Sequence, residues 1–318
     1  MALERKQQTL LDRAQRIVGT RDILGAVAQV RAIIGPEQIP DSEELAQIAL
    51  EKMRRGEVPT PEELAALAIV IRILRPVLLV RNATLPELPR DPDHDLHSAE
   101  YRALWDAFRL KVDPGVASIG RIEGQNGEHV GTGFLVSDTL VATNRHVVDV
   151  LTLGSGVLLP DRQARICFGR EDGVLLKPGD IVEFIDVVDV HPQLDVALLR
   201  VAPQVRKPLV LAEEPLDQAK TVAVIGYPAK DNQNPGFLHP VFNNIFGVKR
   251  AALGELLDGG RSDAAYHDCS TTQGNSGSPV FSMDSGHVVA IHCAGSFMYR
   301  NEAVPYAAWR AFLQSHLT

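Results

Sequence analysis

The stretch GTGFLVSDTLVATNRHVV, Gly131 to Val148, contains short β-rich runs divided by a turn, and its last run ends at a histidine. Similar runs continue toward the C-terminus, separated by Gly, Pro, Asp and Asn: ARICFG, IVEFIDVVDV, DVALLRV, TVAVIGYP, GSPVFS and HVVAIHC. Many short strands with frequent turns are typical of an all-β barrel or sandwich. The residues from Tyr306 to Leu317 then predict a terminal helix, with Trp309 and Phe312 in its apolar stripe.

A second stretch, Gly274-Asn275-Ser276-Gly277-Ser278-Pro279, has the pattern of a turn that carries a nucleophile. A nucleophilic serine must present its hydroxyl on a tight turn, with backbone N–H groups aimed at the developing oxyanion. Glycine on each side permits that turn and lets a substrate backbone approach closely. Taken alone, the same pattern also fits a glycine-rich hairpin turn, so other residues must decide between the two interpretations.

Two further residues supply what a serine nucleophile needs. His146 ends the segment Ala142-Thr-Asn-Arg-His146 and is the candidate general base for Ser276. Asp195 opens the apolar run DVALLRV and is the candidate acceptor for the other imidazole N–H. Asp186 and Asp189, in the preceding run, are competing carboxylates, which we interpret as solvated turn or strand-edge residues.

These segments, in the order His, Asp, Ser, resemble the trypsin-like serine peptidases; subtilisins and α/β hydrolases use other orders. Gly226-Tyr227-Pro228 is also similar to a segment common in bacterial members. The resemblance covers residues 114–318 and implies a chymotrypsin-type double β-barrel with a triad of His146, Asp195 and Ser276. It further implies an oxyanion hole made by the backbone N–H groups of Gly274 and Ser276.

Within this family, the chain most resembles bacterial glutamyl endopeptidases of the staphylococcal type. The resemblance rests on STTQGNSGSP, Ser270 to Pro279, and on IHCAG, Ile291 to Gly295. It implies that Thr271 and His292 bind the carboxylate of the substrate's P1 residue, since a hydroxyl and a partly protonated imidazole can bind an anion. Ser270 stands where trypsins place an aspartate, which disfavours Lys or Arg at P1. We therefore expect a preference for Glu or Asp.

The first part of the chain has a different pattern. Apolar residues recur at roughly helical spacing between Thr9 and Ile34. Thr60-Pro61-Glu62-Glu63 predicts a helix start with a capping box, and the following PEELAALAIVIRILRPVLLV predicts a helix buried in a bundle. Residues 1–85 are therefore expected to form a helical bundle with a recognition or adaptor role.

Residues 86–113 are expected to be a linker with one short amphipathic helix, from Ser98 to Leu110. The peptidase domain is expected to follow over residues 114–318. The predicted fold class is thus α+β, with an N-terminal helical domain preceding a C-terminal all-β double barrel and a C-terminal helix.

The charge of the chain restricts its partners. The formal net charge is -8, whereas binding of phosphate backbones needs concentrated Lys and Arg. The sequence therefore argues against nucleic acid and against an anionic membrane surface. The expected partners are a protein or peptide substrate and a protein bound through residues 1–85.

No cofactor or metal is expected, because His94 and His97 lie in a polar linker and no His/Cys cluster has metal-ligand spacing. An odd count of three cysteines, Cys167, Cys269 and Cys293, does not indicate a disulfide framework, although Cys269 and Cys293 flank the same pocket walls.

The sequence also bears on where the protein acts. The polar start MALERKQQ lacks the apolar core of a secretory signal, and Arg72, Arg75 and Pro76 interrupt the apolar stretch from Leu64 to Val80. We therefore expect a cytoplasmic protein with reduced thiols.

Together these patterns predict a bacterial-type serine endopeptidase that acts through an acyl-enzyme and is regulated through its N-terminal helical region. One alternative is an HtrA-like quality-control protease with an aliphatic P1 preference, although no PDZ-like segment follows Ser276 in the sequence. Another alternative is a non-catalytic binding module on a peptidase fold, which a broken triad would favour.

Overall fold

The computed structural model describes residues 42–64, 66–67, 75, 77–88, 99–213, 216, 219–230, 242–296 and 300–317. The helical spacing predicted between Thr9 and Ile34, and the linker residues His94 and His97, lie outside these described residues.

The first barrel consists of six antiparallel strands that close in the order β2-β3-β4-β7-β6-β5. Its core is lined by aliphatic side chains such as Ile122, Leu135 and Leu199, all fully buried. A short helix, α6 (Arg145–Thr152), follows β4 and buries Val147 and Leu151 against the same core. The strands are β2 (Ile119–Glu123), β3 (His129–Leu135), β4 (Leu140–Thr143), β5 (Arg165–Cys167), β6 (Ile181–Val190) and β7 (Ala197–Val201).

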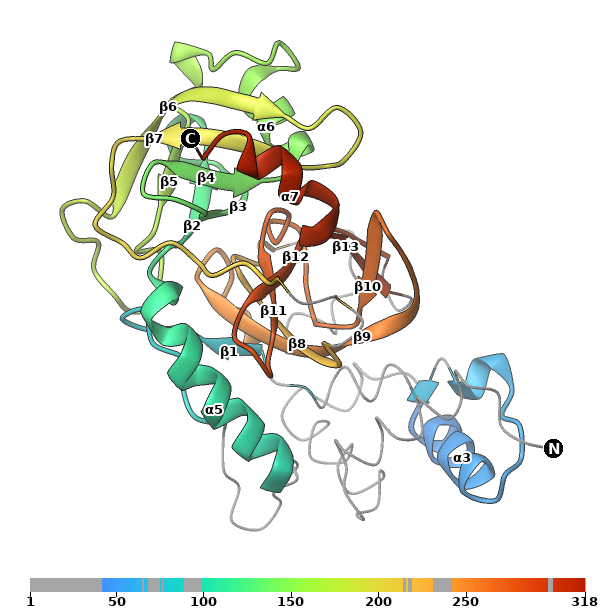
Figure 1. Cartoon of the computed structure of the whole chain (residues 1–318). Helices are drawn as coiled ribbons and strands as arrows, with labels where there is room; N and C mark the ends of the chain where they lie inside the picture. The colour runs from blue at the N-terminus through green and yellow to red at the C-terminus, as the bar shows by residue number, and fades with distance from the viewer. Residues whose placement is uncertain are drawn as a thin grey trace.

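The second barrel also has six antiparallel strands, in the order β9-β10-β13-β12-β11-β8, and the pairing of β8 with β9 closes it. The chain then continues into α7 (Tyr306–Gln314), which leads back over the first barrel (Figure 1). The strands are β8 (Thr221–Gly226), β9 (Arg250–Arg261), β10 (Ala264–His267), β11 (Pro279–Ser282), β12 (Val288–Ser296) and β13 (Arg300–Pro305).

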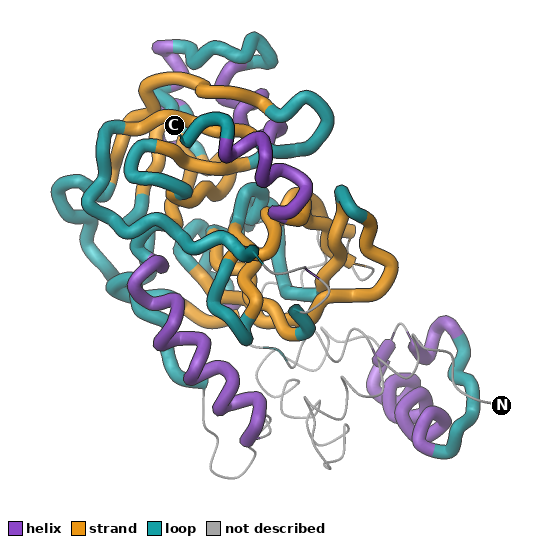
Figure 2. The backbone as a smooth tube through the Cα atoms, in the orientation of Figure 1, coloured by secondary structure: helices purple, strands orange, loops and turns teal. Residues whose placement is uncertain are grey.

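Two groups of strands therefore make up most of the molecule, with the helices at their periphery (Figure 2). This arrangement confirms the predicted double β-barrel of chymotrypsin type and its C-terminal helix.

In the N-terminal part, α3 (Ser42–Arg54) and the helical turn after Thr60 belong to the region expected to be helical. The capping box forms as predicted: the Glu63 N–H donates to Thr60 Oγ1 at 3.3 Å, and the Thr60 N–H donates to Glu63 Oε2 at 2.8 Å. Lys52 Nζ also lies 2.7 Å from Glu63 Oε1, which ties α3 to this turn.

The helix predicted to run through Val80 is wrong at its end, because Val77–Leu79 is a strand, β1. It pairs antiparallel with β9, with Val77 opposite Ala252. Pro76 accounts for the change: proline cannot donate a helical hydrogen bond and disfavours the α conformation of the residue before it. The apolar run that follows then extends the second sheet instead.

The predicted linker helix begins at Ala99 and continues to Val116 as α5, beyond its expected end at Leu110. Its buried side includes Trp105 and Phe108, and the Phe108 ring meets Phe281 of the second barrel at 5.9 Å. Trp105 Nε1 also donates to the carbonyl of Pro86 at 2.9 Å. One face of the helix is thus packed against the second barrel, while the helix itself lies at the periphery.

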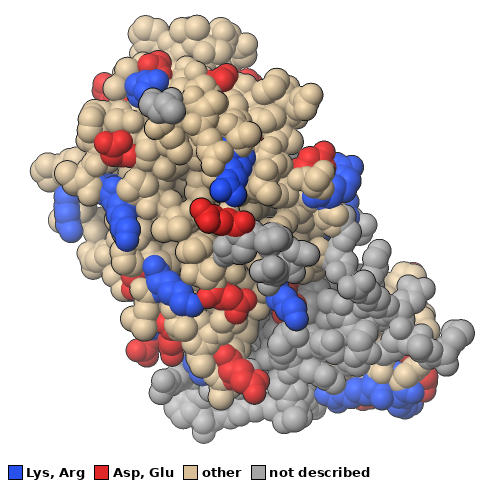
Figure 3. All heavy atoms as spheres, in the orientation of Figure 1, with Lys and Arg blue, Asp and Glu red and all other residues tan. Residues whose placement is uncertain are grey.

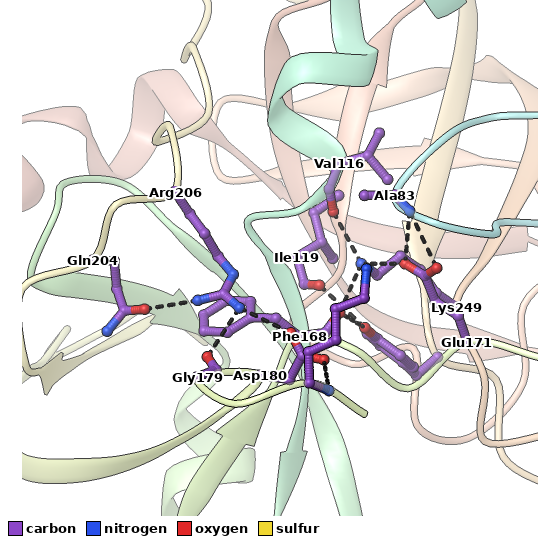
Figure 4. A network of polar contacts seen from close by, with 12 residues as sticks. Ala83, Val116, Ile119, Phe168, Glu171, Gly179, Asp180, Gln204, Arg206 and Lys249 are labelled. Atoms are coloured by element: carbon purple, nitrogen blue, oxygen red, sulfur yellow. Dashed lines mark hydrogen bonds and ion pairs between the residues drawn. The ribbon is translucent and has the colours of Figure 1, made fainter. Parts of the chain in front are cut away.

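A buried lysine links the two barrels (Figure 4). Lys249 Nζ donates to the carbonyls of Val116 and Phe168 and lies 3.2 Å from Glu171 Oε1. The Glu171 carboxylate in turn accepts the Ala83 N–H at 3.1 Å. Burial lowers the pKa of Lys249, while the neighbouring Glu171 acts in the opposite direction. This network joins the first barrel, the second barrel and the segment after β1.

The surface drawn in Figure 3 carries interspersed basic and acidic side chains rather than one large basic face. Among the described residues, the helices are too short or too polar to cross a membrane.

Candidate active site

The candidate base and its carboxylate are held at the ends of two neighbouring strands. His146 lies in the first turn of α6, directly after β4, and Asp195 lies between β6 and β7. His146 Nδ1 is 2.7 Å from Asp195 Oδ2, and the His146 backbone N–H donates to Asp195 Oδ1 at 3.1 Å. Both carboxylate oxygens therefore face the same histidine.

Asp195 is kept ionised by this arrangement. Burial acts to raise the pKa of Asp195, but its hydrogen bonds from His146, together with the charges of His146 and Arg145, outweigh burial and lower the pKa. An ionised carboxylate beside Nδ1 accepts the hydrogen bond from the Nδ1–H group of the imidazole. Nε2 is then the ring nitrogen that can accept a proton.

Two residues next to His146 position the loop that carries Asp195. Asn144 Nδ2 donates to the Asp195 carbonyl at 2.7 Å, and the Arg145 guanidinium donates to the carbonyls of His191 and Leu194. Asn144 and Arg145 are functional candidates that the sequence pattern alone left unassigned. The signal was their place in the Ala142-to-His146 segment, where polar side chains directly precede a candidate base.

The serine turn requires glycine on both sides of Ser276. Gly274 and Gly277 adopt φ values of +84° and +86°, which side chains with a Cβ rarely adopt. A Cβ on Gly277 would also lie 2.0 Å from the Thr132 carbonyl oxygen. Thr132, on β3, donates its N–H to the Ser276 carbonyl at 2.8 Å and its hydroxyl to the Gly274 carbonyl at 2.8 Å. The turn of the second barrel is thus fastened to the first barrel.

Ser276 and the His146 helix meet across Gly131. A Cβ at Gly131 would lie 2.8 Å from a Val147 methyl group and 3.1 Å from the Ser276 carbonyl oxygen. Ser276 Oγ donates to the Cys293 carbonyl at 3.5 Å, and within the described residues no hydrogen bond joins it to His146. Catalytic hydrogen bonds are often long without substrate, so the arrangement stays compatible with proton transfer.

The backbone around Gly274 leaves two N–H groups without a protein acceptor in the described part of the chain. The Gln273 carbonyl accepts the Ala229 N–H at 2.6 Å. In a trans peptide the carbonyl and the N–H point in opposite directions, so the Gly274 N–H is directed away from Ala229. Within the described part of the chain, the N–H groups of Gly274 and Ser276 donate to no other protein group. Both donors are available to a developing oxyanion.

The predicted pocket residues lie on two segments. Ser270 and Thr271 follow β10 and are half-buried, and His292 lies on β12 with only 3% of its surface exposed. Thr271 Oγ1 is 3.9 Å from where a Cβ on Gly295 would stand, so this hydroxyl faces the β12 backbone. The structure therefore places the Thr271 hydroxyl beside the strand that carries His292.

His292 is part of a buried histidine pair. Its Nδ1 lies 3.1 Å from His267 Nε2, and the Cys269 N–H donates to His267 Nδ1 at 3.3 Å. Burial, with a smaller contribution from the charge of His146, lowers the pKa of His292 to about 3. The expectation of a partly protonated His292 is therefore wrong, because the ring is neutral at neutral pH.

Among the described residues, no cysteine forms a disulfide bond. Cys269 Sγ is directed to the Val222 carbonyl and Cys293 Sγ to the Glu302 carbonyl, so the two thiols have different neighbours. Burial, followed by the charge of Asp195, raises the pKa of Cys293 to about 12. Within the described residues, no group of three or more His, Cys, Asp or Glu side chains is placed to hold a metal ion.

Known proteins resemble this chain over its β-rich part. A sequence model described as the trypsin-like peptidase domain matches residues 131–291, just over half of the chain. Serine proteases MT3772 and Rv3671c of Mycobacterium tuberculosis are each 35% identical over 102 residues, which is 32% of this chain. The match spans 21% of the length of these curated relatives.

Solved structures of similar chains have also been found. The inactive form of the Rv3671c protease matches with 21% identity and a TM-score of 0.46, covering 73% of this chain and 100% of that one. A serine endoprotease from Yersinia pestis matches with 17% identity and a TM-score of 0.48, covering 72% of this chain and 67% of that one. By the match over residues 131–291, the chain belongs to the trypsin-like peptidase domain family.

Proposed function

We propose that this protein is a serine endopeptidase that hydrolyses peptide bonds through His146, Asp195 and Ser276. The observation that carries the proposal is the pairing of His146 Nδ1 with Asp195 at 2.7 Å, beside a serine turn fastened to the same barrel. The membership of the trypsin-like family supports the same activity. A filled set of base, carboxylate and serine also weighs against a purely non-catalytic binding module.

In the proposed reaction, His146 Nε2 takes the hydroxyl proton of Ser276 as Oγ attacks the scissile carbonyl. The negative charge that develops on the carbonyl oxygen is stabilised by the N–H groups of Gly274 and Ser276. The imidazolium then donates its proton to the leaving amine, which departs and leaves an acyl-enzyme. A water molecule then attacks the acyl carbon while His146 takes its proton. The bond from the acyl carbon to Ser276 Oγ breaks, the imidazolium returns the proton to Oγ, and the acid product leaves.

The second part of the proposal is a preference for Glu or Asp at P1. Because His267 Nδ1 accepts the Cys269 N–H, a neutral His267 carries its proton on Nε2 and donates it to His292 Nδ1. The proton of His292 then lies on Nε2, where it is a donor for a substrate carboxylate. The Thr271 hydroxyl, beside the same strand, supplies a second donor.

The activity is tested by incubating the full-length protein and its Ser276→Ala variant with a randomised peptide library. The expected result is cleavage that is absent from the variant, together with labelling of Ser276 by a fluorophosphonate. Labelling without cleavage of the library would indicate an enzyme that needs a partner. Neither labelling nor cleavage would overturn the proposed activity in favour of the binding module.

The specificity is tested with matched peptides that differ only in P1, carrying Glu, Gln, Leu or Lys. Glu is expected to give the highest kcat/KM. Thr271→Val, which removes a hydroxyl and keeps the shape, should lower kcat/KM for the Glu peptide about tenfold and change the Leu peptide little, because one hydrogen bond to a charged group is lost. Efficient cleavage after Leu and none after Glu would favour the HtrA-like alternative.

The cytoplasmic location expected from the sequence is likewise a proposal. Cell fractionation of the source organism, with the protein recovered beside soluble cytoplasmic markers, is the expected outcome; recovery outside the cytoplasm would contradict it.

A further inference from the structure

Arg75 is a buried cation that the N-terminal segment places against the second barrel. Its side chain is 2% exposed. One guanidinium nitrogen bonds to Asp268, and another lies 3.4 Å from Glu255 Oε1. The two acidic side chains are themselves only 2% and 7% exposed. Removing one partner from a buried ion pair leaves a poorly solvated charge, so each member strongly constrains the others.

Asp268 connects this ion cluster to the proposed pocket. Its Oδ1 also accepts the Glu255 N–H at 2.7 Å, which fixes the carboxylate on β9. The residue before it, His267, bonds to His292, and the chain after it runs through Cys269 into Ser270 and Thr271. The position of Asp268 therefore sets both the histidine pair and the start of the pocket loop.

Arg75 is held in place by the strand that follows it. Val77 pairs with Ala252 of β9, and its carbonyl accepts a hydrogen bond from Arg250 at 2.9 Å. The Val80 N–H donates to the Lys249 carbonyl at 3.1 Å, and this connection continues to Ala83 and Glu171. The segment from Arg75 to Ala83 is thus fastened to the barrels.

We propose that Arg75 is a positioning residue through which the N-terminal segment sets the geometry of the substrate pocket. The proposal rests on the proposed peptidase function and names a regulatory contact of that same site. Arg75 acts on substrate only through Asp268. When the segment leaves its place on β9, Asp268 and Glu255 lose this cation and repel each other, and the loop that carries Ser270 and Thr271 relaxes. Substrate binding is therefore coupled to docking of the N-terminal region.

The test compares four full-length proteins: wild type, Arg75→Met, Arg75→Lys and Arg81→Met. Arg81 is the matched control, because it lies in the same segment and pairs with Asp172, but its side chain is 60% exposed. With the Glu peptide, Arg75→Met should raise KM at least tenfold, and Arg75→Lys should recover part of that loss. Labelling of Ser276 by a small fluorophosphonate should fall much less, because the triad is not part of the ion cluster.

Hydrogen exchange of the backbone amides gives a readout that does not depend on activity. Arg75→Met should speed exchange over residues 267–272, while exchange in β3 and β7 of the first barrel stays at the wild-type rate. Failure of the wild type to cleave peptides would count against the proposed function, and the exchange experiment would still decide the role of Arg75.

Two outcomes would overturn the role of Arg75. One is an unchanged exchange rate over residues 267–272 in Arg75→Met. The other is an equal acceleration across both barrels, which would show a general loss of stability instead. The charge-balanced variant Arg75→Met/Glu255→Gln removes the repulsion between Glu255 and Asp268, so it should bring both the thermal stability and the exchange rate of residues 267–272 back toward the wild type.

Discussion

Any residue other than glycine at position 274 would face two obstacles: an unfavourable φ angle and atoms too close to its Cβ. The φ of Gly274, +84°, lies in the left-handed region, and an added Cβ would stand 2.6 Å from the Tyr227 carbonyl oxygen and 2.5 Å from the His129 ring. The same residue supplies one of the two proposed oxyanion donors. Close packing around the turn therefore fixes the direction of this proposed oxyanion donor.

Gly274→Ala is expected to lower kcat about 100-fold or more, because displacement of the turn misdirects an oxyanion donor. Gly156→Ala is the matched control: Gly156 has a φ of +72°, but nothing lies within 4 Å of its added Cβ. The control carries the backbone strain alone and should keep its kcat. Steady-state kinetics of both variants check this, and equal losses would assign the effect to strain rather than to the oxyanion turn.

Asp195 is the proposed catalytic carboxylate, and Asp186 is a nearby surface carboxylate. Substituting each one by Asn tests the assignment. Asp195→Asn should lower kcat roughly 10³- to 10⁴-fold, because an amide can donate to Nδ1 and so favours the wrong imidazole tautomer. Asp186→Asn removes a carboxylate that is 49% exposed and pairs with Arg200, and should change kcat less than twofold. A large loss in Asp186→Asn with little loss in Asp195→Asn would reverse the assignment.

At the level of elements, α7 supports the loop that holds Asp195. The Phe312 ring meets His191 at 5.1 Å and His316 at 5.2 Å, and His316 Nε2 lies 3.1 Å from Asp189. His191 Nδ1 in turn accepts the Leu194 N–H at 3.0 Å, one residue before Asp195. The C-terminal helix and the segment before His146 thus hold the same loop from two sides.

Phe312→Ala is expected to lower kcat about three- to tenfold with little change in KM, because a small displacement of a catalytic group costs rate. Leu317→Ala, beyond the end of α7 and 48% exposed, is the control and should resemble the wild type. Kinetics with the Glu peptide measure both. A rise in KM with an unchanged kcat would place the effect in the pocket instead.

Sequence patterns predicted the β-rich part well and the N-terminal part less well. The spacing of apolar runs and the glycines around Ser276 are local signals, so they predict strands and a tight turn directly. Pro76 is a local signal that the helix ends, whereas the pairing of Val77–Leu79 with β9 depends on a partner far away in the chain, which no local pattern predicts. The same holds for Arg75, whose partners Asp268 and Glu255 lie far along the sequence. The low pKa of His292 also depends on burial by distant segments.

At the level of the whole molecule, burial of neutral histidines makes stability depend on pH. Burial, with smaller charge effects, lowers the pKa to about 3 in His292 and to about 4 in His129. In the unfolded chain both rings take up protons near their ordinary pKa of about 6.5. Between about pH 6.5 and 4 the unfolded state therefore binds more protons, and stability falls as the pH falls.

The free energy of unfolding should decrease by roughly 2–3 kcal/mol per pH unit in the steepest part of this range, at about 1.4 kcal/mol per histidine. The lowered pKa of Asp195 adds a loss of the same sign at still lower pH. Urea unfolding at a series of pH values measures the slope, and His129→Gln should reduce it by about half. A profile that is flat from pH 6.5 to 4 would contradict this prediction.

The junction between the barrels should behave as a single electrostatic unit. The side chains of Lys249 and Glu171 are 0% and 4% exposed, and their pair joins both barrels to the segment after β1. Lys249→Met should lower the free energy of unfolding by about 3–5 kcal/mol, because it leaves the Glu171 charge buried without its cation. The paired variant Lys249→Met/Glu171→Gln should recover most of that loss.

Lys111→Met is the control, because Lys111 is exposed and donates to the Asp284 carbonyl at the surface. Its free energy of unfolding should change by less than about 1 kcal/mol. Urea unfolding of all four proteins distinguishes the explanations. Recovery in the paired variant identifies the uncompensated charge as the cause, whereas an additive loss would mean that the carbonyl contacts of Lys249, and not its charge, hold the barrels together.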